Sequence, residues 1–156
     1  MWSSILNRIL EFDDVRLLQK YIARFSDGSI RSMNPGKGWR IPRSNEMLAE
    51  LLKHGTDVNA RDWYGRTWLH YAALKETPDL AGWLLKHGAE IDAIDHQSGT
   101  TPLGLAAWNG GADIVDFLLV HGANLQLPKD DQWARPLTFA KAQGHSEIVK
   151  RLEQSA

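Results

Sequence analysis

The sequence has no cysteine among its 156 residues, and this absence removes several classes of protein at once. Without cysteine there is no disulfide framework, no thiolate metal site and no cysteine nucleophile. No apolar run approaches the 18 residues that a membrane-spanning helix needs. A chain without cysteine also fits a reducing compartment, so these absences predict a soluble, cytoplasmic domain that does not cross a membrane.

Charge of one sign is lacking too. Lysine and arginine number 18 and the acids 19, so the net charge is −1 and favours neither nucleic acid nor an anionic membrane as a partner. The N-terminal stretch MWSSILNRILEF is apolar but has no basic leader, and Arg8 and Glu11 interrupt it. We therefore expect a helix there rather than a signal peptide. The length suits one domain.

Motifs of common catalytic sites are absent. The sequence has no G-x-S-x-G and no H-E-x-x-H, and the glycines of GKG (36–38) lack the upstream glycine of a phosphate-binding loop. The paired acids Asp13-Asp14 and Asp130-Asp131 fall at expected helix or turn starts, so we interpret them as solvated caps. We expect no enzymatic activity, no cofactor and no small-molecule substrate.

The chain repeats itself instead. HGTDVNARD (54–62), HGAEIDAID (87–95) and HGANLQLPK (121–129) are related, and TWLHYAAL (67–74), TPLGLAAW (101–108) and RPLTFAKA (135–142) recur every 34 residues. Each unit reads as two short amphipathic helices, the first capped by a threonine and the second ended by a glycine. A single pair cannot bury its apolar face, whereas stacked pairs share a core.

These units resemble the ankyrin repeat, whose pattern is D-x-x-G-x-T-P-L-H-x-A-A-x-x-G followed by I/V-V-x-x-L-L-x-x-G-A. Residues 62–93 match it at twelve positions, among them Asp62, Gly65, Thr67, Leu69, His70 and Gly88. Residues 95–123 match it at fourteen, among them Asp95, Gly99, Thr101, Pro102, Gly110 and Gly122. The resemblance is to small stand-alone ankyrin proteins of bacterial type, and it covers about residues 45 to 152.

The resemblance implies an all-α solenoid of stacked helix-turn-helix units with short β-hairpin turns and an N-terminal helical cap. We divide the single domain 1–156 into capping helices (1–25), a degenerate repeat with a long basic loop (26–61), two repeats (62–94 and 95–128) and a C-terminal capping repeat (129–156). Glu153 and Gln154 stand where apolar residues would stack a further unit, as a polar cap requires.

The histidines are explained by this architecture. His54, His87 and His121 occupy one repeat position, where a histidine can bond the last carbonyls of its helix. Successive repeats lie about 10 Å apart, which is too far for these side chains to share a zinc ion. His70 is expected to support the start of its helix, and His96 and His145 to be exposed turn residues. We expect no metal site.

The resemblance also implies a binding surface, because ankyrin repeats bind proteins through the hairpin tips and the exposed face of the first helix. Tryptophan, tyrosine and arginine dominate interface hot spots. Projecting the variable positions onto this chain predicts partner-binding residues at Arg61, Trp63, Tyr64, Arg66, Leu74, Lys75, Ile94, His96, Gln97, Trp108, Asn109 and Trp133. The alternative is that these aromatics pack sideways onto a neighbouring tip. Trp68, at the family's proline position, is expected to be scaffold.

The stretch from Ser26 to Asn45 is a separate candidate. It carries Arg31, Lys37, Arg40 and Arg43 and, between Ile30 and Asn45, no acid, and structureless stretches of this length are often functional. The alternative is a solvated insertion left by a decayed repeat. If it binds, Arg40 and Arg43 would meet an acidic patch of a partner, and nucleic acid is the less favoured ligand.

Together these features predict a non-enzymatic module that binds, and inhibits or neutralises, one partner protein. The specific hypothesis is an immunity protein for a bacterial toxin or effector. The alternatives are a structural adaptor that bridges two proteins and, less favoured, a nucleic-acid-binding protein that uses the 26–45 loop.

Overall fold

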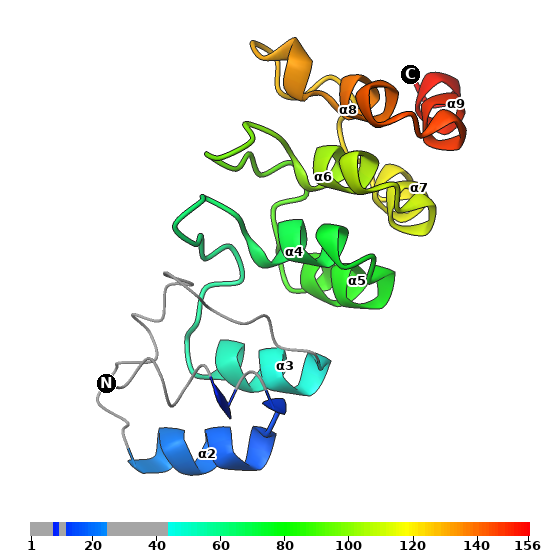
Figure 1. Ribbon diagram of the computed structural model, residues 1–156. Coiled ribbons are helices and arrows are strands. Elements are labelled where there is room, and N and C mark those ends of the chain that lie inside the picture. The colour runs from blue at the N-terminus through cyan, green and yellow to red at the C-terminus, as the bar shows by residue number, and fades with distance from the viewer. Residues whose placement is uncertain (1–7, 10–11, 25–43) are drawn as a thin grey trace. The chain divides into compact units, whose positions relative to one another are not determined.

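The structure is a computed structural model that describes residues 8–9, 12–24 and 44–156. By its internal contacts the chain divides into two compact units, Met1–Trp63 and Tyr64–Ala156. The described residues contain helices and no strand (Figure 1). The helices are α2 (Val15–Arg24), α3 (Asn45–Lys53), α4 (Trp68–Leu74), α5 (Pro78–Lys86), α6 (Pro102–Asn109), α7 (Ala112–Val120), the 3-10 helix η1 (Gln132–Ala134), α8 (Pro136–Gln143) and α9 (Ser146–Gln154).

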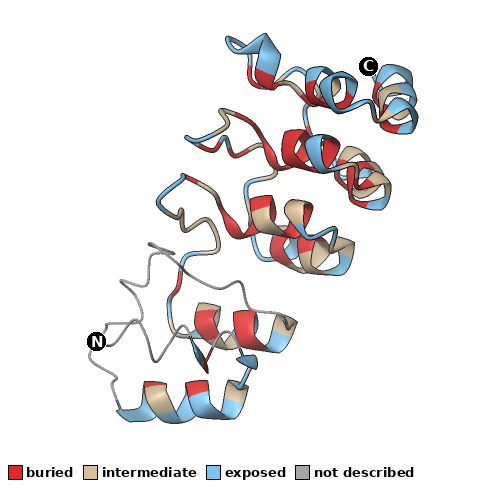
Figure 2. Cartoon of the chain, in the orientation of Figure 1, coloured by how far each residue is buried: buried red, intermediate tan, exposed pale blue. Residues whose placement is uncertain are grey.

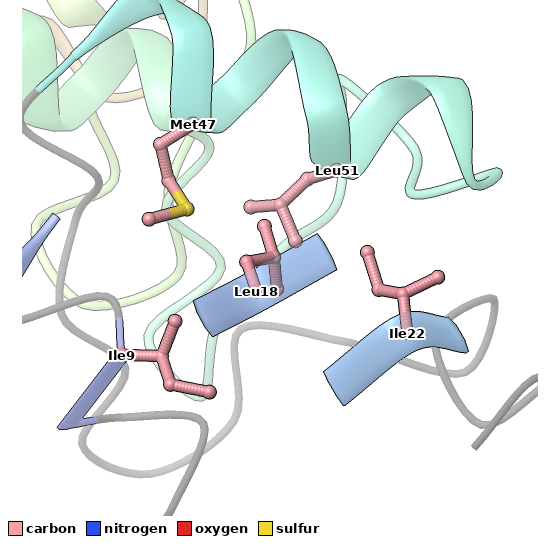
Figure 3. Packing of buried hydrophobic residues seen from close by; sticks show 5 residues of the cluster. All are labelled: Ile9, Leu18, Ile22, Met47 and Leu51. Carbon is pink, nitrogen blue, oxygen red and sulfur yellow. The ribbon is translucent and has the colours of Figure 1, made fainter. Parts of the chain in front are cut away.

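The core of the first unit joins α2 to α3. Buried apolar side chains from both helices and from Ile9 point toward one another, as Figure 3 shows; they are Ile9, Leu18, Ile22, Met47 and Leu51. Asp14 caps α2, because its carboxylate accepts a hydrogen bond from the Leu17 N–H at 2.9 Å, as the sequence predicted. Ser44 caps α3 by accepting from Met47 N–H.

The second unit is a stack of three helix pairs, α4/α5, α6/α7 and α8/α9. Helices α4, α6 and α8 form one row and α5, α7 and α9 the other, and the hairpin tips project beside the first row (Figure 1). The middle pair is the most deeply buried, because it has a neighbour on each side: residues Pro102 to Ala107 of α6 are all buried (Figure 2). This confirms the predicted all-α repeat solenoid.

Turn chemistry explains where these helices end. Gly110 and Gly144 follow α6 and α8 with φ of 90° and 75°, a left-handed conformation that glycine adopts without strain. The equivalent residue after α4 is Glu76, which has φ 54° although it is not glycine. Its carboxylate accepts a hydrogen bond from Asn109 Nδ2 at 2.8 Å, which links the end of α4 to the end of α6. The sequence did not predict this departure.

Candidate functional site

A buried line of polar groups lies beneath the hairpin tips of the second unit. The Thr67 N–H donates to His70 Nδ1 at 3.1 Å, so Nδ1 carries no proton and the Thr67 hydroxyl donates to it as well. His70 Nε2–H then donates to the Thr100 carbonyl at 3.3 Å, and the Thr100 hydroxyl donates to the Ala134 carbonyl. His70 and Thr100 are fully buried. These bonds connect the three repeats, so the structural role predicted for His70 is confirmed.

The other histidines that end helices behave similarly. His87 Nδ1–H donates to the Trp83 carbonyl at 2.7 Å and His121 Nδ1–H to the Phe117 carbonyl at 2.8 Å, as predicted. His54 differs, because its Nε2 bonds the Glu50 carboxylate instead. His145 is not a plain exposed turn residue: its ring lies against Gly110, and Nε2–H donates to the Trp108 carbonyl. Each contact satisfies a polar group at a helix end.

Asp95 lies in the hairpin tip between α5 and α6, which we call the first tip of the second unit, and its side chain is buried. Its carboxylate accepts hydrogen bonds from Ser98 N–H and hydroxyl and from Arg66 Nε, the last at 3.1 Å. Burial raises the pKa of Asp95, but the hydrogen bonds from Ser98 and Arg66 outweigh it and hold the pKa below its ordinary value of 3.8. The carboxylate therefore stays ionised and fixes the tip.

Tyr64 is held over this tip. The Arg66 guanidinium carbon lies 5.7 Å from the centre of the Tyr64 ring, and the Tyr64 carbonyl accepts from His96 N–H at 2.7 Å. The His96 ring lies so close to Gly65 that a Cβ there would come within 2.7 Å of it. Tyr64 is nevertheless 47% exposed. Tyr64 therefore combines an exposed ring with a backbone and a neighbour that are fixed by hydrogen bonds.

The second tip of this unit is built differently. With the 34-residue spacing, Lys129 stands where the previous tip has Asp95, and Trp133 stands where it has Gly99. The anchor is instead Arg135, whose guanidinium donates to the carbonyls of Pro128 and Lys129 and to the Gln126 side chain. The tip ends in η1, which carries Trp133 57% exposed.

Trp108 and Trp133 both pack on Phe139 of α8. The ring centres of Trp108 and Phe139 are 5.1 Å apart and those of Trp133 and Phe139 are 6.2 Å apart, both edge to face. Phe139 is buried, whereas Trp108 is 45% exposed. The sideways packing considered as the alternative therefore does occur, and it leaves much of each indole uncovered.

We use the name tip surface for the exposed residues Tyr64, Ile94, His96, Trp108 and Trp133. Gln97, Lys75 and Asn109 are also exposed; Asn109 bonds Glu76 and the Leu74 carbonyl. Arg66 and Leu74 are half-buried, and Arg66 is engaged by Asp95. Arg61 and Trp63 belong to the first unit, where Trp63 is 70% exposed. Arg40 and Arg43 lie outside the described residues.

The described part of the chain offers no metal site and no membrane-spanning helix. In residues 8–9, 12–24 and 44–156, no group of three or more histidine, aspartate or glutamate side chains could hold a metal ion. Nor is any helix of these segments long and apolar enough to span a membrane. Trp68 is buried, as expected of scaffold.

The geometry defines a repeat solenoid with a preformed surface on one side, and comparison with known families gives its class. The description "Ankyrin repeats (3 copies)" matches residues 41–95 and "Ankyrin repeat" matches residues 98–130, so the chain belongs to the ankyrin repeat family. Ankyrin repeats are protein–protein interaction modules and are generally not enzymatic.

Curated relatives from several sources share these repeats. The chain is 45% identical over 56 residues to the ankyrin repeat protein FPV244 of Fowlpox virus (35% of this chain, 8% of that protein). It is 33% identical over 116 residues to the nuclear factor NF-kappa-B p105 subunit of Gallus gallus (69% and 12%) and 40% identical over 65 residues to the human B-cell lymphoma 3 protein (41% and 14%). The chain thus spans a small part of each relative's length.

Proposed function

We propose that this protein binds one partner protein through the tip surface and inhibits or neutralises it by covering its working surface. The observation that supports the proposal is that large apolar side chains stay exposed at the tips although the repeat scaffold does not require them there. Monomeric proteins rarely gather such residues without an interaction to serve. The specific form of the proposal is a cytoplasmic immunity protein for a bacterial toxin or effector.

The way these side chains are supported favours binding over simple exposure. Tyr64 rests near Arg66, which is fixed by buried Asp95, and Trp108 and Trp133 rest on buried Phe139. Aromatic anchors held in one geometry lose little conformational freedom when a partner covers them. A rigid, preformed surface is also suited to occlusion, because it need not rearrange to block a site.

The alternative is a structural adaptor that bridges two proteins. The observation that favours it is the division into two units: Arg40, Arg43, Arg61 and Trp63 belong to Met1–Trp63, and the tip surface belongs to Tyr64–Ala156. An adaptor would use the two units for different partners, and the basic stretch would take the acidic one. Nucleic acid remains the less favoured ligand of that stretch.

Affinity purification of the intact chain from its native host, followed by reconstitution with each captured protein, tests the proposal. An inhibitor forms a stable one-to-one complex and abolishes an activity of its partner. Binding without any effect on activity, or one complex that contains two partners, supports the adaptor. Nucleic-acid binding that disappears at moderate salt reflects only phosphate contacts.

Substitution locates the surface. The double variant Trp63→Ala, Tyr64→Ala should weaken partner binding by at least about 2 kcal/mol, the threshold of a hot spot, with almost no change in melting temperature. Val120→Ala is the matched control, because Val120 is 83% exposed on α7, which lies in the other row of helices. Unchanged affinity of the double variant, or its unfolding, contradicts the assignment.

A further inference from the structure

The tip that carries Trp133 combines exposed aromatic rings with the carboxylate of Asp131, which makes no capping hydrogen bond. Asp131 precedes η1, yet its side chain makes no capping hydrogen bond. In the part of the chain that the structure describes, Asp131 has no hydrogen-bond or ion-pair partner for its carboxylate. Asp131 does stand at the start of η1, as predicted for a solvated acid, and its exposed carboxylate is left open to solvent.

The side chains of Asp131 and Trp133 both lie beside Gly99. A Cβ added at Gly99 would lie 3.9 Å from Asp131 Oδ2 and 3.9 Å from Trp133 Cζ2. One point beside Gly99 is thus within van der Waals contact of both the carboxylate and the indole. Gly99 itself has φ 61°, a left-handed conformation that favours glycine at this position. The carboxylate and the indole are both exposed there.

The positive charges nearest in sequence do not neutralise Asp131. Arg135 directs its guanidinium to the carbonyls of Pro128 and Lys129 and to the Gln126 side chain. Residues 129–135 hold two basic side chains, Lys129 and Arg135, and two acids, Asp130 and Asp131, and neither basic side chain pairs with Asp131. On α8, which supports Trp133 through Phe139, Lys141 is paired with Glu153 at 2.9 Å. The tip therefore presents one exposed carboxylate, that of Asp131, beside aromatic surface.

We propose that Trp133, Trp108 and Asp131 form a seat for a basic side chain of the partner, arginine in preference to lysine. A cation is attracted by the face of an indole, and a guanidinium can also lie flat on that face. Its N–H groups then reach a carboxylate as charge-assisted donors. This seat rests on the proposed function, because it names the chemistry that the tip surface recognises.

An apolar partner side chain fits the same place less well. It would cover the two indoles but would also remove water from Asp131 without replacing the hydrogen bonds, which is costly for an ionised group. A basic side chain covers the same apolar area and supplies the missing donors. The placement of a carboxylate beside Trp133 therefore selects for charge as well as for shape.

A small probe tests the seat without knowledge of the partner. Binding of N-acetyl-arginine methylamide to the full chain is followed by the NMR signals of the indole N–H groups, assigned with Trp108→Phe and Trp133→Phe. N-acetyl-citrulline methylamide is the neutral probe of the same shape. The arginine probe should shift the Trp108 and Trp133 signals and bind about two- to fivefold more tightly than the citrulline probe, the scale of an exposed cation–π contact.

Asp131→Asn should lower the preference for the arginine probe over the citrulline probe, because it removes the carboxylate and leaves only the contact with the indoles; Asp113→Asn, which removes an exposed acid from α7, should leave the preference unchanged. Equal binding of the two probes, shifts confined to other tryptophans, or no shift with the arginine probe at its solubility limit overturns the seat. So does an Asp131→Asn variant whose preference for arginine equals that of the wild type.

Once the partner has been isolated, the proposed function and the proposed seat can be tested separately. If Trp133→Ala weakens the complex but Asp131→Asn does not, the tip surface binds the partner and the basic seat is wrong. If the probe results hold but no substitution in the tip surface affects the partner, the seat exists and the proposed function is wrong.

Discussion

The two hairpin tips of the second unit occupy equivalent places in the repeat and use their acids in opposite ways. Asp95 is buried and fully engaged, and it fixes Arg66 beneath Tyr64. Asp131 is exposed and its carboxylate is unengaged, and Arg135 anchors its tip instead of an acid. The comparison teaches that a residue type does not reveal its role within a repeat. The hydrogen bonds around it do.

Removing the buried charge should have the largest effect. Asp95→Asn leaves the Arg66 guanidinium without its anion and places an amide N–H₂ against the Ser98 donors. We expect a loss of about 2 to 3 kcal/mol in the free energy of unfolding, since breaking a largely buried ion pair is costly. Urea unfolding measures it. Asp131→Asn is the matched control, with an expected change below about 0.5 kcal/mol; similar losses for both variants would remove the distinction between the tips.

Acid should act through the same carboxylate. Because the pKa of Asp95 is lowered in the folded state, its contribution to stability is fully present above the ordinary pKa of 3.8 and is lost as the pH falls through the lower, folded value. The wild type should therefore lose stability below pH 3.8 more steeply than Asp95→Asn does. Thermal melting across this range checks the slope. Parallel curves for the two proteins would show that Asp95 is not responsible.

Glycines at equivalent positions of two successive tips offer a second contrast. Gly65 and Gly99 both have positive φ, so alanine at either should cost about 1 kcal/mol in backbone strain. Only at Gly65 would the new Cβ also meet a ring, that of His96. Gly65→Ala should therefore be the more destabilising by about 1 kcal/mol, measured by urea unfolding. A larger cost at Gly99 would mean that its open space is closed in solution.

The smallest effect is expected from the hydroxyl that joins the tips. Thr100→Val keeps the shape of the side chain and removes its hydrogen bond to the Ala134 carbonyl. The free energy of unfolding should fall by about 1 kcal/mol, the net value of one such bond, and amide exchange in η1 should accelerate. A variant as stable as the wild type would indicate that the two tips are not coupled through this bond.

Much of the fold could be predicted from the sequence, because each repeat places the same residue types at the same helix ends. Thr101 and Gly122 mark helix ends that the structure confirms, and the spacing of 34 residues places α6 and α8 in equivalent positions. The positive φ of Glu76, 54°, could not be predicted, because the hydrogen bond that holds its side chain comes from Asn109, a residue of the next repeat. Contacts of that kind leave no local pattern.

The candidate site shows the same limit. The family resemblance placed Tyr64, Trp108 and Trp133 at variable positions, and the structure exposes all three. It could not indicate that Trp108 and Trp133 share Phe139, or that the Asp131 carboxylate makes no capping hydrogen bond, because the repeat pattern fixes neither contact. Which of these residues bind a partner stays a prediction.

Hydrogen–deuterium exchange of the intact chain, alone and with its captured partner, tests the central claim most directly. The tip surface, if it is the binding site, should gain protection at residues 64–66, 94–99 and 130–134, while the row formed by α5, α7 and α9 exchanges as in the free protein. Protection confined to α5, α7 and α9, with the tips unchanged, would contradict the account.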